Sequence, residues 1–253
     1  MTNRIVCHFS CGAASAVATK LMLAEYPADQ VVILNAFIKE EHEDNRRFLS
    51  DCEEWFGHPI TVLRDTKYGA STHEVWRKER FMKNHLGASC SRALKRNFLD
   101  SFRLPGDVTV LGFTVEEKHR LDRFFDRGSD LLPVAPLIER GLTKMDCLAI
   151  VERAGIELPA MYKLGYHNAN CIGCIKGGQG YWNKIRRDFP VQFEQIAAIQ
   201  EELGLGANLF RRKDGTRFSL RELPVDAGHY PSEPSVECSF FCEIAEQDIL
   251  EGE

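Results

Sequence analysis

Short apolar runs alternate with longer amphipathic stretches along the first 158 residues of the chain. Compact apolar runs bounded by polar residues or glycine are typical of buried strands, whereas apolar residues spaced three and four positions apart are typical of helices. The pattern predicts strands at residues 4–9, 30–37, 60–65 and 107–113. It predicts helices at residues 14–26, 45–57, 91–102, 116–127 and 143–155, the last with Thr143 as N-cap and Gly155 as C-cap.

This alternation of strands and helices indicates an α/β fold, a doubly wound and mostly parallel sheet with helices on its faces. In such open sheets, ligands bind beyond the carboxyl ends of the strands. We therefore expect a binding site where the first predicted strand ends, at residues 8–15.

The pattern changes after residue 158, which suggests a second unit at residues 159–253. Glycine, asparagine and aromatic residues dominate as far as residue 189, followed by a predicted helix at 190–204 and a hairpin that turns at Asp214–Gly215. Residues 226–253 are rich in proline and then acidic, so we expect them to be extended and partly mobile. We expect the whole unit to be a helical and irregular, cysteine-containing extension that packs on the site of the first unit.

The loop after the first predicted strand has the sequence HFSCGAASAVATK, from His8 to Lys20, and is crowded with small residues. A strand that turns directly into a helix at a glycine points backbone N–H groups at whatever lies above it, which favours an anion. The loop lacks the Gly-Lys-Ser/Thr of a Walker A motif and the three spaced glycines of a dinucleotide fingerprint. We predict that an anion is held by the hydroxyl and amide groups of Ser10, Gly12, Ala13 and Ser15.

Composition limits the classes of function. The net charge of −5 disfavours a protein that chiefly coats nucleic acid. No apolar stretch reaches the length of a membrane span, and no secretory signal precedes the first strand, so we expect a soluble, cytoplasmic protein without a membrane partner. The nine cysteines are then expected to be core residues, metal ligands or reactive thiols rather than disulfides.

The cysteines fall into different sequence settings. Three lie in apolar patterns and are interpreted as buried core residues: Cys7, Cys52 and Cys147. Cys11 lies in the small-residue loop, where we expect it to be exposed beside the anion site, a setting that favours the thiolate. Cys171 and Cys174 form a C-x-x-C pair, which is typical of zinc, an iron–sulfur cluster or a redox dithiol. The candidates for further ligands to a metal at this pair are Cys90, His167, Cys238 and Cys242.

The order of these motifs resembles that of the sulfonucleotide (PAPS and APS) reductases, a family of the PP-loop adenine nucleotide α-hydrolase superfamily. That family carries a PP-loop written S-G-G-x-D-S, cysteine before a basic helix, a G-x-x-x-E/Q segment with an arginine, the motif G-Y-x4-C-x-x-C and, in many members, a cysteine in the tail. This chain carries, in the same order, Ser10 to Ser15, Cys90 before Lys95, Gly112 to Arg120, Gly165 to Cys174, and Glu237–Cys238. The resemblance covers most of residues 5–175.

The resemblance implies that residues 1–158 form a PP-loop nucleotide-binding domain for an adenine nucleotide: PAPS, APS or ATP. Asn35 is then placed to contact the ribose or base, although a turn role at the strand end is an equal interpretation. Lys95 and Arg120, with Arg92 as a further candidate, are expected to neutralise the anion. An equally good interpretation is that these basic residues lie on solvated faces of helices.

The resemblance also implies a [4Fe-4S] cluster held by Cys90, Cys171 and Cys174, with Cys242 or Cys238 as the fourth ligand. Cys238 is the expected nucleophile of an oxidoreductase of sulfur metabolism, attacking the sulfate of the sulfonucleotide. A thioredoxin-like protein is the expected reductant, and a homodimer is compatible with the sequence.

Two alternatives remain open from the residues. The chain has Ser89–Cys90 where the cluster-bearing branch of the family has two cysteines, so that only three ligands match directly. A three-cysteine [4Fe-4S] site resembles that of ATP-dependent, adenylating sulfurtransferases that thiolate nucleobases, and only this alternative has a nucleic acid substrate. The PP-loop aspartate is replaced by Ala14, which leaves open a non-catalytic zinc- or nucleotide-binding module.

Overall fold

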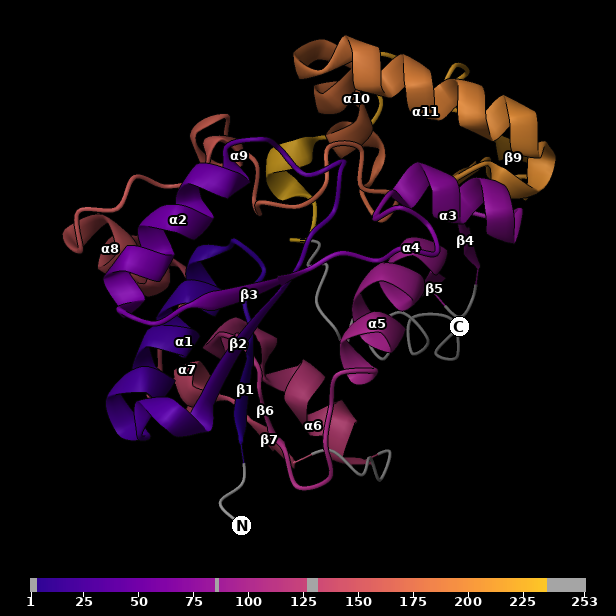
Figure 1. Ribbon diagram of the computed structural model, residues 1–253. Helices are drawn as coiled ribbons and strands as arrows, with labels where there is room; N and C mark the ends of the chain where they lie inside the picture. Colours follow the sequence, from indigo (N-terminus) through magenta and orange to yellow (C-terminus); the bar gives the residue numbers. More distant parts are fainter. Residues whose placement is uncertain (1–3, 85–86, 127–131, 236–253) are drawn as a thin grey trace.

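The protein is described here as a computed structural model covering residues 4–84, 87–126 and 132–235 (Figure 1). Its centre is a five-stranded sheet with the strand order β3-β2-β1-β6-β7, and every neighbouring pair is parallel. The predicted α/β fold with a parallel sheet is therefore confirmed. The strands are β1 Ile5–His8, β2 Val31–Ala36, β3 Ile60–Leu63, β6 Val108–Val110 and β7 Leu132–Val134.

Helices cover both faces of this sheet (Figure 1). Alternate residues of each strand point to opposite faces, so Ile5 and Cys7 of β1 join one core whereas Val6 joins another. The first core is covered by α1 Ala13–Glu25, α2 Asn45–Phe56, α7 Pro136–Glu139 and α8 Lys144–Arg153. The opposite face is covered by α5 Asn97–Asp100 and α6 Lys118–Asp126.

The four predicted strands and most predicted helices are confirmed within two residues or so at each end. Thr143 caps α8 as predicted, and its side chain accepts a hydrogen bond from the Asp146 amide. Gly155 lies one residue beyond the C-cap, Ala154, in the left-handed conformation that glycine favours. The edge strand β7 was not predicted, because Pro133 interrupts a run of only three residues.

The predicted helix at 91–102 is instead three short segments. They are α4 Ser89–Ser91, a π-helical turn at Arg92–Arg96, and α5. π-helical turns are rare in proteins overall, but those that occur are often found at functional sites, where they change the direction of side chains along a helix. Four further helices in the described parts of the chain were not predicted: α3 Thr72–Glu79, α7, α9 Ala160–Lys163 and α10 Gln179–Asp188.

The C-terminal part comprises α9 Ala160–Lys163, α10, α11 Pro190–Leu203 and the strands β8 Phe210–Arg211 and β9 Arg217–Phe218. The hairpin of β8 and β9 turns at Gly215, as predicted. A third core joins this part to the first, because Trp76, Met82 and Leu94 pack in one cluster with Trp182 and other residues of α10 and α11. In Figure 1, α3 accordingly lies beside α11. The predicted division at residue 158 stays a prediction, but residues 159–235 share a core with α3, α4 and the π-helical turn.

The tail prediction falls largely outside the described residues, which end at residue 235. Before that point, the chain forms a short 3-10 turn at Tyr230–Ser232 and packs against α10. Within the described parts of the chain, no helix has both the length and the apolar character needed to cross a membrane.

Candidate functional site

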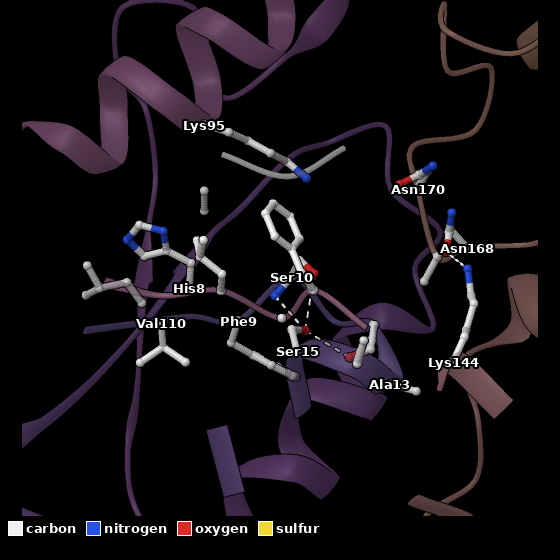
Figure 2. A pocket seen from close by; sticks show the side chains of 18 of the residues that line it. His8, Phe9, Ser10, Ala13, Ser15, Lys95, Val110, Lys144, Asn168 and Asn170 are labelled. Carbon is white, nitrogen blue, oxygen red and sulfur yellow. Dashed lines mark hydrogen bonds between the residues drawn. The ribbon is translucent and has the colours of Figure 1, made fainter. Parts of the chain in front are cut away.

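A cavity opens at the carboxyl ends of β1 and β6, where the connections from the two strands leave the sheet in opposite directions (Figure 2). This is the position at which open α/β sheets bind ligands. Residues from β1, β2, α1, the π-helical turn, β6, α8 and the C-terminal part all contribute to it. It is lined by His8, Phe9, Ser10, Gly12, Ala13, Ala14, Ser15, Leu34, Ala36, Lys95, Leu99, Val110, Leu111, Gly112, Phe113, Lys144, Tyr162, Asn168, Ala169 and Asn170.

The small-residue loop forms the floor of this cavity. The Ser15 hydroxyl accepts hydrogen bonds from the Ser10 amide at 3.1 Å and the Ser10 hydroxyl at 3.2 Å, and donates to the Gly12 carbonyl at 2.8 Å. Helix α1 begins directly after Gly12, which has no side chain to cap the first turn. The positive end of the helix and the two hydroxyls therefore face the cavity together (Figure 2).

Gly112, at the end of β6, allows this loop to lie close to the sheet. A Cβ atom at this position would come within 3.1 Å of the Ser15 Cα and 3.2 Å of the Ser15 nitrogen. A larger residue would push the start of α1 away from β6. The glycine of the predicted G-x-x-x-E segment is thus explained by packing against the loop.

Two lysines approach the cavity from opposite sides (Figure 2). Lys95 comes from the π-helical turn, is only 7% exposed, and places its Nζ 3.7 Å from the Glu41 carboxylate. Lys144 comes from the first turn of α8 and hydrogen-bonds to Asn168 Oδ1 and, at 3.1 Å, to the Ser235 hydroxyl. An anion bound between them would receive charge-assisted hydrogen bonds.

Sequence reasoning found Lys95 but missed Lys144, Asn168 and Asn170. Lys144 follows the predicted N-cap Thr143, and helices that follow strands in this fold begin at the ligand-binding edge of the sheet, so its position carried a usable signal. The two asparagines lie in an irregular segment whose course depends on tertiary packing.

The other half of the cavity is largely apolar, with Leu34, Leu99, Val110 and Phe113 among its walls. Burial lowers the pKa of His8 to about 4, because the charged imidazolium loses its hydration there. His8 is therefore neutral at pH 7 and adds to the apolar side. None of the described residues lining the cavity is an aspartate or a glutamate.

Three predicted residues do not line the cavity. Asn35 is buried, and its amide donates to the Phe9 carbonyl at 2.9 Å and to the Cys11 sulfur at 3.5 Å, so it braces the loop from behind. Arg120 pairs with Glu117 and lies over the Phe113 ring, whose centre is 4.3 Å away. Arg92 pairs with Glu79 at 3.4 Å. Direct contact of Asn35 and Arg120 with a nucleotide stays a prediction.

The expectation for Cys11 is wrong. Its side chain is fully buried, with 0% exposure, and it adopts a positive φ of 57° that turns it inward below the loop. Burial raises the pKa of the Cys11 thiol instead of lowering it, since a thiolate there would be desolvated. By contrast, Cys7, Cys52 and Cys147 are buried in the core as predicted.

A second cavity brings together the predicted cysteines Cys90, Cys171 and Cys174 from two distant parts of the chain. Cys171 is buried, and Cys90 and Cys174 are partly buried. The remaining walls are mostly apolar, with one lysine: Ile38, Thr72, Trp76, Ala88, Ser91, Gly173, Ile175 and Lys176. Cys238 and Cys242 lie outside the described residues.

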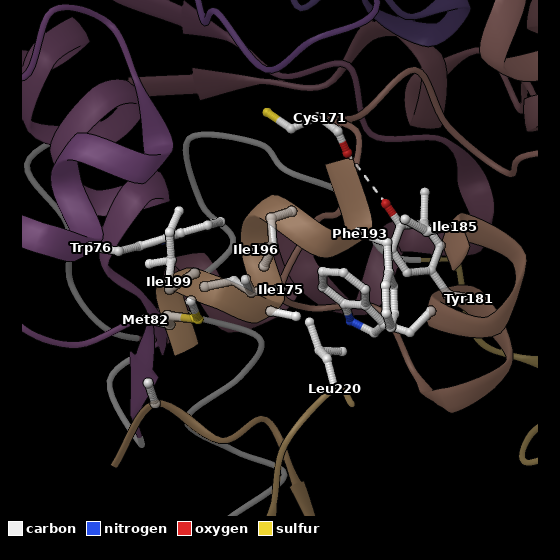
Figure 3. Packing of buried hydrophobic residues seen from close by; sticks show 14 of the residues in the cluster. Trp76, Met82, Cys171, Ile175, Tyr181, Ile185, Phe193, Ile196, Ile199 and Leu220 are labelled. Carbon is white, nitrogen blue, oxygen red and sulfur yellow. Dashed lines mark hydrogen bonds between the residues drawn. The ribbon is translucent and has the colours of Figure 1, made fainter. Parts of the chain in front are cut away.

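The C-x-x-C loop is held in a defined shape. The Tyr181 hydroxyl accepts from the amides of Gly173 and Cys174 at 3.1 and 2.9 Å and donates to the Cys171 carbonyl at 3.3 Å (Figure 3). Gly173 has a φ of +77°, which explains why glycine stands between the two cysteines. On the other side of the loop, the Ile172 amide donates to the Glu40 carbonyl at 2.9 Å.

In residues 4–84, 87–126 and 132–235, no group of three or more His, Cys, Asp or Glu side chains is placed to hold a metal ion. Three thiols from two distant segments line the second cavity, and thiolates are the ligands that iron–sulfur clusters take. The donor chemistry at this cavity is therefore compatible with a cluster.

The same chain segments supply both cavities, although no residue lines both of them. Ala36 lines the first cavity and Ile38 the second, and in the helical segment after β5 Gly87–Ala88, Cys90 lines the second cavity and Lys95 the first. The buried Glu41 connects residues of the two sets, since its carboxylate approaches Lys95 while its backbone pairs with Cys171.

Comparison with known proteins assigns no family to this pair of cavities. A scan against protein-family models finds no match to the chain, and a search of the curated proteins finds none either.

Proposed function

We propose that this chain is a sulfonucleotide reductase-like enzyme of the PP-loop type, which binds PAPS or APS beside a [4Fe-4S] cluster. The observation that carries this proposal is the convergence of Cys90, Cys171 and Cys174 on one cavity, whose lining comes from the same chain segments as a cavity lined by hydroxyls and lysines. Ser10, Cys90, Lys95, Gly112, Cys171 and Cys174, which belong to the motifs that resemble the family, are spread over about 165 residues, and each lines one of these two cavities.

The first cavity has two halves that match the two halves of an adenine nucleotide. The apolar walls around Leu99 and Phe113 suit the base, and the neutral His8 adds an aromatic ring there. The hydroxyls of Ser10 and Ser15, the start of α1 and the lysines suit the phosphate and sulfate groups.

The polar lining favours a sulfonucleotide over ATP. Mg²⁺, the usual companion of ATP, is bound through carboxylates and phosphates. Ala14 stands where the PP-loop carries its aspartate, and the described lining has no carboxylate at all. PAPS and APS carry fewer adjacent charges, which Lys95 and Lys144 can neutralise directly.

Cys90, Cys171 and Cys174 would hold the cluster, with Cys242 or Cys238 as the fourth ligand. The group would supply an iron–sulfur centre of adjustable potential beside the anion. Lys176 and the basic segment that follows Cys90 would offset its negative charge.

The proposed reaction starts at Cys238. Its thiolate attacks the sulfur of the sulfate group, a new S–S bond forms, and the S–O bond to the phosphate breaks with its electron pair leaving on AMP or the 3′-phosphate of AMP. One thiolate of a thioredoxin-like dithiol then attacks the Cys238 sulfur, and sulfite leaves with the electron pair of the S–S bond, which gives a mixed disulfide. The second thiolate of the dithiol attacks its partner sulfur, the mixed disulfide breaks with its electron pair on Cys238, and the dithiol ends as a disulfide.

The last described residue of the chain, Ser235, lies at the first cavity. The Ser235 hydroxyl is bound by Lys144 at 3.1 Å and by the Asn168 amide at 2.8 Å, and both residues line the cavity. Cys238 itself lies outside the described residues.

The test uses protein purified without oxygen and supplied with PAPS or APS and a thioredoxin-like reductant. We expect iron and acid-labile sulfide in the protein, release of sulfite, and loss of sulfite release in Cys238→Ser. Cys52→Ala, at a buried cysteine of α2, serves as the control and should keep the activity. Sulfite release by Cys238→Ser at the wild-type rate would exclude the proposed nucleophile.

One observation favours a second function, an ATP-dependent adenylating sulfurtransferase that acts on a nucleobase. Only three cysteines line the second cavity among the described residues, and a three-thiolate cluster leaves one iron open to exogenous sulfur. Cleavage of ATP to AMP and pyrophosphate, without sulfite release from PAPS or APS, would establish this alternative. Zinc in place of iron and sulfide would instead indicate a non-catalytic module.

A further inference from the structure

We propose that the indole N–H of Trp76 donates a hydrogen bond to a sulfur atom of the cluster held by Cys90, Cys171 and Cys174, and thereby raises its reduction potential. This inference rests on the proposed function, because it requires the cluster. Trp76 would be a positioning residue for the cluster. It carries no sulfur, and it lies in none of the family motifs named above.

The observation is a buried donor at the wall of the cysteine cavity. Trp76 lines this cavity, and its side chain is 2% exposed. Its Nε1 atom is buried, and within the described part of the chain it has no hydrogen-bond partner. A buried N–H without an acceptor is costly, so native structures nearly always provide one. A cluster sulfur in the adjoining cavity is an acceptor of the right chemistry.

Glu40 contacts both the start of α3, which carries Trp76, and the C-x-x-C loop. The Glu40 carboxylate accepts from the Ser71 hydroxyl at 2.5 Å and the Thr72 amide at 2.8 Å, which anchors the start of α3. The Glu40 carbonyl accepts from the Ile172 amide, between the two cysteines. Trp76 lies one turn into α3, so its ring is placed relative to the loop by a single residue.

The direction of the effect follows from charge. Reduction adds an electron to the cluster, and a hydrogen bond to its sulfur stabilises the more negative state. The bond therefore raises the reduction potential, and its removal lowers it.

Trp182 provides a matched control within the same core. It is 0% exposed, and its Nε1 is also buried without a hydrogen-bond partner among the described residues. It packs against Phe193 but is not among the residues that line the cysteine cavity. Replacing either tryptophan with phenylalanine removes the same atoms from one hydrophobic cluster.

The experiment measures the midpoint potential of the anaerobically reconstituted full chain by redox titration with electron paramagnetic resonance. We expect a shift to more negative potential in Trp76→Phe, no shift in Trp182→Phe, and equal iron and sulfide contents in both. An unchanged potential in Trp76→Phe, or an equal shift in both variants, overturns the inference.

A second measurement avoids the variants, should Trp76→Phe fail to fold. Wild-type protein labelled with indole-¹⁵N tryptophan should show hyperfine coupling between ¹⁵N and the reduced cluster, and absence of coupling overturns the inference. If wild-type protein contains no iron and sulfide, the proposed cluster fails as well. If the cluster is present but neither its potential nor its hyperfine coupling depends on Trp76, only the role of Trp76 is contradicted.

Discussion

His8 shows how one residue at the end of β1 couples folding to pH. Burial lowers its pKa to about 4, whereas in the unfolded chain the pKa stays near the ordinary histidine value of 6.5. Between these values the unfolded state binds more protons than the folded state, so the free energy of unfolding falls as the pH falls. The contribution is fully present above about pH 6.5 and is lost towards pH 4.

We predict that this single group costs the folded state about 3 kcal/mol by pH 4, since one pKa unit corresponds to about 1.4 kcal/mol. His8→Asn should reduce the dependence of unfolding free energy on pH by this order, as measured by urea denaturation between pH 7 and pH 4. His119→Asn, at an exposed histidine of α6, is the control. Equal pH dependence in wild type and His8→Asn would contradict the burial argument.

Lys95 is the residue whose charge should matter most for binding, because it is almost fully buried at the cavity. A charge-assisted hydrogen bond contributes about 1.5–3 kcal/mol, so Lys95→Met should weaken nucleotide binding by about 10- to 100-fold. Isothermal titration with PAPS, APS and AMP measures the change. Lys118→Met, at a surface lysine paired with Asp122, should bind like wild type. A loss confined to PAPS and APS would place Lys95 at the sulfate rather than at the phosphate.

At the scale of elements, the conformation of the C-x-x-C loop depends on how the loop packs against its neighbours as much as on its cysteines. A Cβ atom on Gly173 would come within 2.2 Å of the Ile196 Cδ1 of α11 and 3.3 Å of the Trp182 ring of α10. Gly57, which ends α2 with a similar positive φ of 62°, has nothing within 4 Å of such an atom. Substituting Gly57 with alanine therefore tests the cost of the left-handed backbone conformation alone. At Gly173, the cost of crowding is added to it.

We predict that Gly57→Ala loses about 1 kcal/mol of unfolding free energy, the cost of the left-handed conformation alone. Gly173→Ala should lose a further 1–3 kcal/mol or so through overpacking, and should also bind less iron because the loop shifts. Thermal and urea denaturation give the stabilities, and iron analysis gives the loading. Equal losses in the two variants would mean that α10 and α11 yield to the extra methyl group.

At the scale of the whole molecule, the third core joins segments that are far apart in the chain. Residues of α3 and the segment after it pack with α10 and α11, and the cysteine cavity lies inside this cluster. The core around β1 and α1 is separate from it. A cluster bound by Cys90 and by the 171–174 loop would link two parts of one core and leave the other core unaltered.

Removing the cluster by oxidation and chelation should therefore increase amide hydrogen exchange unevenly. We expect faster exchange in residues 72–100 and 160–190, with β1 and α1 protected as before. Cys90→Ala should reproduce this pattern in protein prepared without oxygen, whereas Cys147→Ala, at a core cysteine of α8, should not. Uniform loosening of both cores would contradict the separation of the two units.

The sequence by itself determined the α/β class, because strand and helix periodicities are local and hydrophobic burial enforces them. It also determined the turn between strand and helix at Ser10 to Ser15, which the structure places between β1 and α1, whereas the binding of an anion there stays a prediction. Segments without clear periodicity were not predicted from the sequence. Helix α10 begins in a glycine-rich run, and β7 is a three-residue edge strand.

Only the tertiary structure decided which side chains share a site. Lys144 and Asn168 meet at the first cavity through the packing of separate segments, and no local pattern encodes that distance. Cys11 looked exposed in the sequence and is buried, because the loop turns its side chain inward against Asn35. Local chemistry thus predicts what a segment can form, whereas long-range packing sets burial, and burial sets the charge and reactivity of each group.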